Sequence, residues 1–304
     1  MENIIDPINK TILKRELSPD KFLRKTRKGD NEIFVVDNWN APNVVQEIGR
    51  LREVTFRASG GGTGKSIDLD EYDTNEHCYK QLVLWSPEDE EIIGGYRFIK
   101  CQEAMDDLGH IQLSTTHYFD FSERFVKEFL PFTIELGRSW VQPNYQPGVN
   151  PRKGLFALDN IWDGLGALIK FNPEIKYFFG KVTMYPNYNT DCRDFLLHFM
   201  HHYFPDRDNL MKPFHPLVQN YDKAYVDGQL DGLDFKDGFK VLNGHVRDKG
   251  EFIPPLVNIY MNLSPTMRTF GTAVNPDFGN VEETGILVTI ADIFPDKKDR
   301  HINF

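Results

Sequence analysis

Cysteine is scarce in this chain of 304 residues, and long apolar runs are missing. The three cysteines, Cys78, Cys101 and Cys192, are widely spaced and odd in number, which argues against a disulfide framework. No segment approaches the roughly 18 consecutive apolar residues of a membrane-spanning helix. The first residues, MENIIDPINK, lack the basic and then apolar pattern of a signal peptide. We therefore expect a cytoplasmic protein with reduced thiols, at most peripheral at the inner face of a membrane.

Positive charge is also in deficit. The formal net charge of -10 opposes binding to nucleic acid, and we expect no such partner. Residues 10–28 run against this balance, because eight basic and two acidic residues give them a net charge of +6. They lie in a basic N-terminal arm, residues 1–32, for which we consider two roles. The arm is either simply solvated, or it docks an acidic protein or an anionic lipid surface.

Alternating strand and helix patterns predict a single mixed α/β domain over residues 33–304. A polar segment broken by Pro, Asp and Gly, at about 205–252, is expected to be an insertion. The expected strands are 33–38, 80–86, 91–101, 132–143, 175–185, 266–274 and 284–293, and the expected helices are 41–58, 121–130, 154–170, 190–204 and 254–263.

Two short motifs point to other chemistry, and we discount both. The segment 59–66, SGGGTGKS, resembles a phosphate-binding P-loop, but Ser59 replaces the first glycine and a helix rather than a strand precedes it. His198, His201 and His202 share a helical spacing that could hold a metal, yet no carboxylate stands in a matching motif. We expect a flexible loop over the substrate, a half-buried amphipathic helix and no metal.

Six charged residues stand inside or beside segments that should be buried. They are Arg52 on the first long helix, Asp70 and Asp73 in LDEYD, Arg97 in GGYRF, and Glu135 and Arg138 in ELGRSW. Burying such groups is costly unless they are paired, so we predict that they converge in one mutually satisfied network. Networks of this kind are common at active sites, and a purely structural ion-pair network is the alternative.

The order of these motifs resembles a known family. R-x-x-x-F (Arg52 and Phe56), D-x-x-D, G-x-Y-R and E-L-G-R resemble the acyl-homoserine-lactone synthases, and resemble more closely the N-acyl amino acid synthases that begin ornithine-lipid and glycine-lipid biosynthesis. The latter are often labelled hemolysin-like and belong to the GNAT superfamily. The resemblance runs from about Arg52 to Pro143, and more loosely through 161–169, 178–188 and 253–263.

The resemblance implies a GNAT-like, mostly antiparallel sheet flanked by helices, with strands 132–143 and 175–185 splayed around a thioester arm. It implies transfer of a 3-hydroxy fatty acyl group from an acyl carrier protein to the α-amine of glycine or ornithine, as the first step of an aminolipid pathway. The acyl-phosphopantetheine thioester, or acyl-CoA, would be a co-substrate, with no tightly bound cofactor. Two alternatives stay open: a homoserine-lactone-type signal synthase, and a non-catalytic acyl-carrier or lipid-binding protein.

The resemblance also implies roles for the motif residues. Glu135 corresponds to the general base, acting through water, and Arg138 organises Glu135 and the acidic pair. The substrate-binding residues carried over are Arg52, Phe56, Asp70, Asp73 and Arg97.

Chemistry adds two further groups to the predicted site. Backbone N–H groups around Ser139, Trp140 and Val141 would stabilise the tetrahedral oxyanion. The usual pyrophosphate motif of GNAT enzymes is replaced by NPRKGLF. We predict that Arg152, Lys153 and Gly154 lie at a helix N-terminus there and bind the phosphate of the donor.

Overall fold

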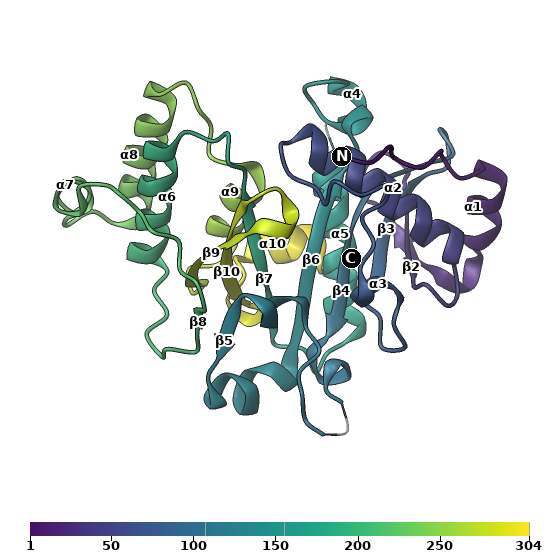
Figure 1. Cartoon of the computed structure of the whole chain (residues 1–304), viewed down its shortest axis with the longest axis horizontal. Coiled ribbons are helices and arrows are strands. Elements are labelled where there is room, and N and C mark those ends of the chain that lie inside the picture. Colours follow the sequence, from purple (N-terminus) through teal and green to yellow (C-terminus); the bar gives the residue numbers. More distant parts are fainter. Residues whose placement is uncertain (107, 155, 304) are drawn as a thin grey trace.

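The computed structural model of the chain describes residues 1–106, 108–154 and 156–303. Its strands are β1 (Phe22–Lys25), β2 (Glu32–Val36), β3 (Lys80–Ser86), β4 (Glu91–Lys100), β5 (Phe119–Phe121), β6 (Thr133–Val141), β7 (Tyr177–Met184), β8 (Met211–Pro213), β9 (Arg268–Asn275) and β10 (Val281–Thr289). Within the described residues, eight of them form one sheet in the order β1-β2-β3-β4-β6-β7-β10-β9 (Figure 1). Neighbours in it are antiparallel except β6 and β7, which are parallel. β5 and β8 pair separately. The predicted mixed, mostly antiparallel α/β fold is confirmed.

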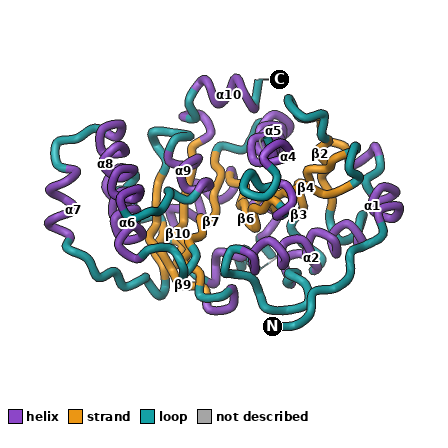
Figure 2. The backbone as a smooth tube through the Cα atoms, turned by 90° about the horizontal axis from the view of Figure 1, so that it is seen from above, coloured by secondary structure: helices purple, strands orange, loops and turns teal. Residues whose placement is uncertain are grey.

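Helices cover both faces of the sheet, with α2 and α5 on opposite sides (Figure 2). Ile48 and Leu51 on α2 are buried in one core cluster, whereas Ile161, Leu165 and Leu168 on α5 are buried in another. Both sets follow the three- and four-residue spacing of a helical face. The helices are α1 (Lys10–Glu16), α2 (Pro42–Ala58), α3 (Glu71–Thr74), α4 (Pro151–Gly154), α5 (Ala157–Phe171), α6 (Thr190–Tyr203), α7 (Lys223–Leu230), α8 (Phe235–Asp248), α9 (Pro255–Met261) and α10 (Pro295–His301).

The parallel strands β6 and β7 separate halfway along their length. Their pairing begins at Thr133 and ends where Leu136 meets Gly180, although both strands continue. Arg138 lies just beyond this point with a φ of 47°, a left-handed conformation that costs a non-glycine residue of order 1–3 kcal/mol. The register between β4 and β6 shifts at the same place. The strands therefore splay, as predicted.

Residues 1–32 are built into the domain instead of forming a free arm. Leu13 and Leu17 on and after α1 are buried in the same core cluster as α2. β1 adds an edge strand to the sheet by pairing with β2. Lys10 forms an ion pair with Glu91 at the start of β4, at 2.9 Å, and Lys14 forms one with Glu90 in the preceding turn, at 2.6 Å. Two lysines of the basic segment are therefore already paired with carboxylates of the same chain.

One other segment has more structure than its sequence pattern indicated, and another is a different kind of helix. The polar segment at 205–252, which is predicted to be an insertion, contains β8, α7 and α8, and its Leu230, Leu242 and Val246 are buried in the large core cluster. The predicted helix at 121–130 is helical from residue 123 onward, and most of it is a five-residue π-helix, Phe125–Phe129, followed by a 3-10 turn at Leu130–Phe132. Along the described part of the chain, no helix combines the length and apolar character that crossing a membrane requires.

Candidate active site

The six-residue convergence predicted from the sequence is largely present, and its centre is Arg52. The Arg52 Nε donates to Asp68 at 2.9 Å, and its two terminal nitrogens donate to Asp73 at 3.0 and 3.1 Å. All three side chains are fully buried. A fork-to-carboxylate arrangement of this kind satisfies the guanidinium and fixes its geometry. Asp68 was not among the residues predicted for the network.

Arg97 and Arg138 complete the network. Arg97 Nη1 donates to Asp70 at 2.7 Å and to Asp73 at 3.1 Å, and Arg138 Nε donates to Asp68 at 3.0 Å. Burial by itself would raise the pKa of Asp73, but the adjacent Arg52 and Arg97 hold that pKa well below its usual range. The contacts of the network tie α2, β4 and β6 together.

Glu135 lies apart from the arginines. Its carboxylate accepts hydrogen bonds from Tyr79 Oη at 3.0 Å, Ser114 Oγ at 2.7 Å and Thr115 Oγ1 at 2.8 Å, and it is completely buried. Burial raises the pKa of Glu135. The predicted contact with Arg138 is replaced by these hydroxyls. Ser114 is the hydroxyl that connects Glu135 to the cavities described next.

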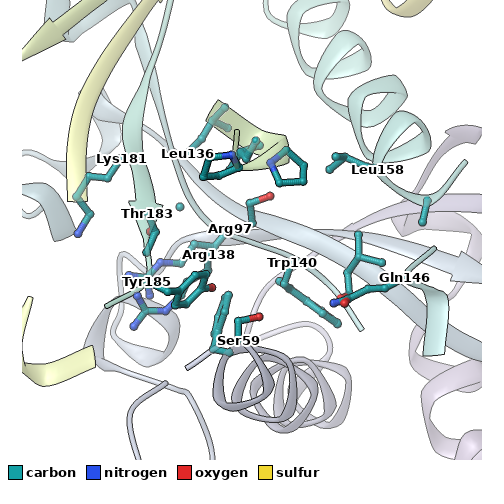
Figure 3. A pocket seen from close by; sticks show the side chains of 18 of the residues that line it. Ser59, Arg97, Leu136, Arg138, Trp140, Gln146, Leu158, Lys181, Thr183 and Tyr185 are labelled. Carbon is teal, nitrogen blue, oxygen red and sulfur yellow. The ribbon is translucent and has the colours of Figure 1, made fainter. Parts of the chain in front are cut away.

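A cavity of about 520 Å³ lies where β6 and β7 splay (Figure 3). Lys181 and Arg138 lie at one end of it, with Gln146 and Leu158 toward the other. The edge of β6 that faces β7 has no partner strand beyond Leu136 among the described residues, which leaves backbone there directed at the cavity. Seven of the predicted site residues line the cavity, namely Phe56, Arg97, Arg138, Ser139, Trp140, Val141 and Gly154.

A second, more polar cleft of about 990 Å³ adjoins this cavity. Asp68 and Asp70 line it together with the glycine-rich loop 60–65. The amides of Thr63 and Gly64 donate to the buried Glu53 at 3.0 and 2.8 Å, so they are not available to cradle a phosphate. The two hollows share five lining residues, Arg97, Ser114, Arg138, Lys181 and Phe278, and therefore meet at this point.

The phosphate-binding prediction gains little from the geometry. Arg152 and Lys153 do lie at the start of a helix, but this helix is the four-residue α4, and the long helix α5 begins only at Ala157. Lys153 Nζ pairs with Asp89 at 2.6 Å. Gly154 lines the cavity, and an added Cβ there would lie 2.4 Å from the Pro147 backbone nitrogen, so packing requires the glycine.

Sequence reasoning gave no role to Ser114, Lys181 or Glu283, which are among the residues that line the cavities. Ser114 begins a short 3-10 helix, while Lys181 and Glu283 interrupt the strands β7 and β10. Lys181 Nζ pairs with Glu283 Oε2 at 2.6 Å, and both side chains are nearly buried. For Lys181 and Glu283 the sequence did offer a signal, the same one that indicated Arg97, namely a charged residue within an apolar strand.

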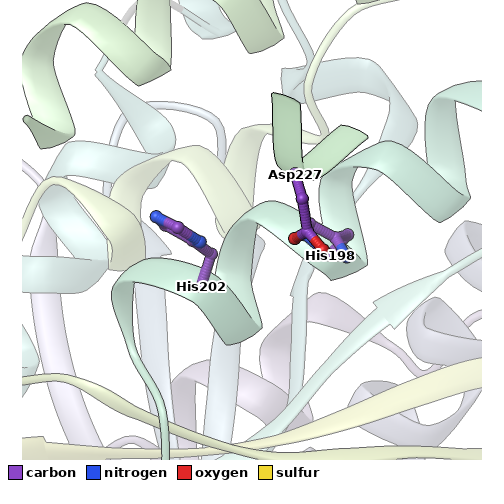
Figure 4. Close-up of side chains that lie close together, drawn as sticks. All are labelled: His198, His202 and Asp227. Carbon is purple, nitrogen blue, oxygen red and sulfur yellow. The ribbon is translucent and has the colours of Figure 1, made fainter. Parts of the chain in front are cut away.

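The histidine-rich helix α6 receives a carboxylate from α7 that the sequence did not indicate. Asp227 lies 2.8 Å from His198 Nε2, and Tyr221 Oη lies 2.7 Å from His198 Nδ1 (Figure 4). Ligand atoms of His198, His202 and Asp227 lie within 4.8 Å of one another. His201 instead contacts Thr269. The existing contacts explain the cluster as a link that fastens α7 to α6.

Comparisons with known proteins agree with this geometry. Residues 51–152 match the family model "Acetyltransferase (GNAT) domain". Over 99% of its length the chain is 56% identical to a glycine N(alpha)-acyltransferase of Phocaeicola vulgatus, covering 93% of that protein. It is 54% identical, again over 99%, to a glycine N(alpha)-acyltransferase of Bacteroides thetaiotaomicron, covering 90% of it. No solved structure matches. The chain therefore belongs to the N-acyl amino acid synthases of the GNAT superfamily and is an amino-acid N-acyltransferase.

Proposed function

We propose that this enzyme transfers a 3-hydroxy fatty acyl group from an acyl carrier protein thioester to the α-amine of glycine, as the first step of an aminolipid pathway. The observation that carries the proposal is the meeting of two hollows of different character at Arg97, Ser114 and Arg138. One is a largely apolar cavity between splayed strands, suited to a thioester and its chain. The other is a charged cleft, suited to an amino acid. The names of the two relatives favour glycine over ornithine.

The donor side favours a carrier protein. Lys28 Nζ lies 4.9 Å from the centre of the Phe156 ring, and the adjacent Ala157 lines the cavity. Part of the basic segment 10–28 therefore lies at the surface beside the cavity. Positive charge there would attract an acidic carrier protein and counter the net charge of the chain. Acyl-CoA is the alternative donor, and the two share the same thioester arm.

The reaction needs one group of the enzyme that accepts a proton from the substrate ammonium. The ammonium of the amino acid gives a proton to Ser114 Oγ as that hydroxyl passes its own proton to Glu135, whose raised pKa suits it to accept. The amine nitrogen then attacks the thioester carbon, and the C–N bond forms. Backbone N–H groups near Ser139 stabilise the oxyanion until the C–S bond breaks. The thiolate takes the second nitrogen proton, and Glu135 returns its proton to solvent.

The test is an assay of purified enzyme with 3-hydroxyacyl carrier protein or the matching acyl-CoA. Each donor is combined with glycine, ornithine or S-adenosylmethionine, and products are identified by mass spectrometry. N-acylglycine formed faster from the carrier protein is the expected result. N-acylornithine would overturn the choice of acceptor, and a faster reaction with acyl-CoA would overturn the choice of donor. A lactone from S-adenosylmethionine would show a signal synthase instead.

A further inference from the structure

We infer that Lys181 and Glu283 form the binding site of the zwitterionic amino acid, with Lys181 holding its α-carboxylate and Glu283 holding its α-ammonium. The inference rests on the proposed function and assigns the residues that would hold its acceptor. Glu283 lies outside the segments by which the sequence resembles its family, and Lys181 lies in a segment, 178–188, where the resemblance is loose and implies no role for it.

The position of the pair is the first support. Lys181 lies on β7 and lines both hollows at their meeting point, and Glu283 lies on the neighbouring β10 and lines the cavity. Their charged atoms are 2.6 Å apart, with side chains that are 12% and 5% exposed. Asn275 Nδ2 donates to Glu283 Oε2 at 3.3 Å, which helps to fix the carboxylate. A small molecule at the junction would therefore contact both charges.

The energetics of a buried ion pair give the second support. Removing both charges from water costs several kcal/mol, so an apolar pair of similar volume is often at least as stabilising. A pair retained beside a substrate cavity is better explained by function than by folding. Burial lowers the pKa of Lys181, so its ammonium is poorly solvated, and a second carboxylate beside it would be favourable.

Glycine complements this pair in charge and in size. Its ammonium and carboxylate are separated by a single carbon, so the molecule can insert between Lys181 and Glu283 and leave every charge with an opposite partner. Arg97 and Arg138 are less suited, because Asp68, Asp70 and Asp73 already neutralise them. Lys181 Nζ also lies 4.0 Å from the centre of the Tyr118 ring, a cation–π contact that helps to position the ammonium.

The experiment compares glycine with glycinamide, which keeps the α-amine and lacks the carboxylate charge. We expect the wild-type enzyme to prefer glycine in kcat/KM by about 10- to 100-fold, the usual range for a hydrogen bond to a charged group. Lys181→Met should reduce this preference to about twofold or less, through a higher KM for glycine. A preference that persists in Lys181→Met overturns the inference.

Two further variants separate binding from folding. Glu283→Gln should raise the KM for glycine more than it lowers kcat. The double variant K181E/E283K keeps an ion pair but reverses its direction, so thermal unfolding should stay near that of wild type while glycine is acylated poorly. Recovery of wild-type glycine kinetics in the double variant would show a purely structural pair. Lys100→Met, which removes the exposed pair with Glu174, is the matched control.

The failure of this inference is distinguishable from failure of the proposed function. If wild-type enzyme acylates no glycine but acylates another amine, the proposed acceptor is wrong. If it acylates glycine and the Lys181 and Glu283 variants behave like Lys100→Met, the acceptor is right and the assigned binding residues are wrong.

Discussion

The Ser114 hydroxyl donates a 2.7 Å hydrogen bond to the buried carboxylate of Glu135 and lines both substrate hollows. Ser114 is therefore the shortest link between the amine-binding region and the carboxylate that the family resemblance names as the base. In the proposed mechanism this hydroxyl takes the place of the water that the family resemblance implies. We therefore expect Ser114 and Glu135 to act as a functional unit whose parts can be tested separately.

Glu135→Gln should lower kcat by about 10²-fold or more, because a general base contributes 10² to 10⁴ in rate. Ser114→Ala should have an effect of similar size if the hydroxyl carries the proton. Thr115→Val is the control, since Thr115 also donates to Glu135, at 2.8 Å, but lines neither hollow. Steady-state kinetics at saturating glycine measures the effect. Equal losses in Ser114→Ala and Thr115→Val would contradict the proton path.

Arg52→Met should destabilise the fold strongly. The substitution leaves Asp68 and Asp73 buried with fewer partners, and breaking a buried pair on one side typically costs about 3–5 kcal/mol. Urea denaturation measures the free energy of unfolding. Lys127→Met, which removes an exposed pair with Glu123, should leave the midpoint nearly unchanged. Equal midpoints for the two variants would contradict a structural role for the network.

Acid should remove the contribution of the network. The pKa of Asp68 and of Asp73 is lowered in the folded protein, because their arginine partners outweigh the effect of burial. The unfolded state then binds protons first, so the stabilisation is present above the ordinary aspartate pKa of about 4 and is lost as pH falls below it. Thermal melting from pH 7 to pH 3 measures this. In Asp73→Asn, the melting temperature should fall less steeply between pH 7 and pH 3 than it does in the wild-type protein.

The charged network could be predicted because a single sequence shows where charged residues interrupt segments that are otherwise apolar. Arg97 and Arg138 interrupt strands, and their cost of burial requires partners. The exact partners could not be predicted, since Asp68 looks like one more residue of an acidic stretch. Glu135 was expected inside the charged network and beside Arg138, but its partners are hydroxyl groups, which a one-dimensional pattern does not show.

Tertiary packing explains the helices and strands that the sequence pattern did not predict. β1 is a four-residue edge strand within a basic segment, too short for alternation to be read. α8 is amphipathic, but its glycines and charges obscured the buried Leu242 and Val246. The splay of β6 and β7 followed from the family resemblance alone. The left-handed backbone at Arg138, just beyond the point where the strands part, is not encoded in any local propensity of arginine.

Leu158→Trp should shift the enzyme toward shorter acyl chains. Leu158 lies toward the end of the cavity that is remote from Lys181 (Figure 3). If the larger side chain excludes two methylene groups of the acyl chain from the cavity, about 1.6 kcal/mol of hydrophobic binding free energy is lost. The kcat/KM for a long-chain donor should therefore fall by roughly tenfold. A donor shorter by four carbons should be nearly unaffected. An equal loss for both chain lengths would place the acyl chain elsewhere.

The central claim is that the acyl thioester lies between the splayed strands β6 and β7. Photo-crosslinking with an acyl carrier protein whose chain carries a diazirine, followed by peptide mass spectrometry, measures this directly. Labels on Trp140, Val141 or Leu158 are the predicted result. Labels confined to α6–α8 or to the loop 59–66 would contradict the account.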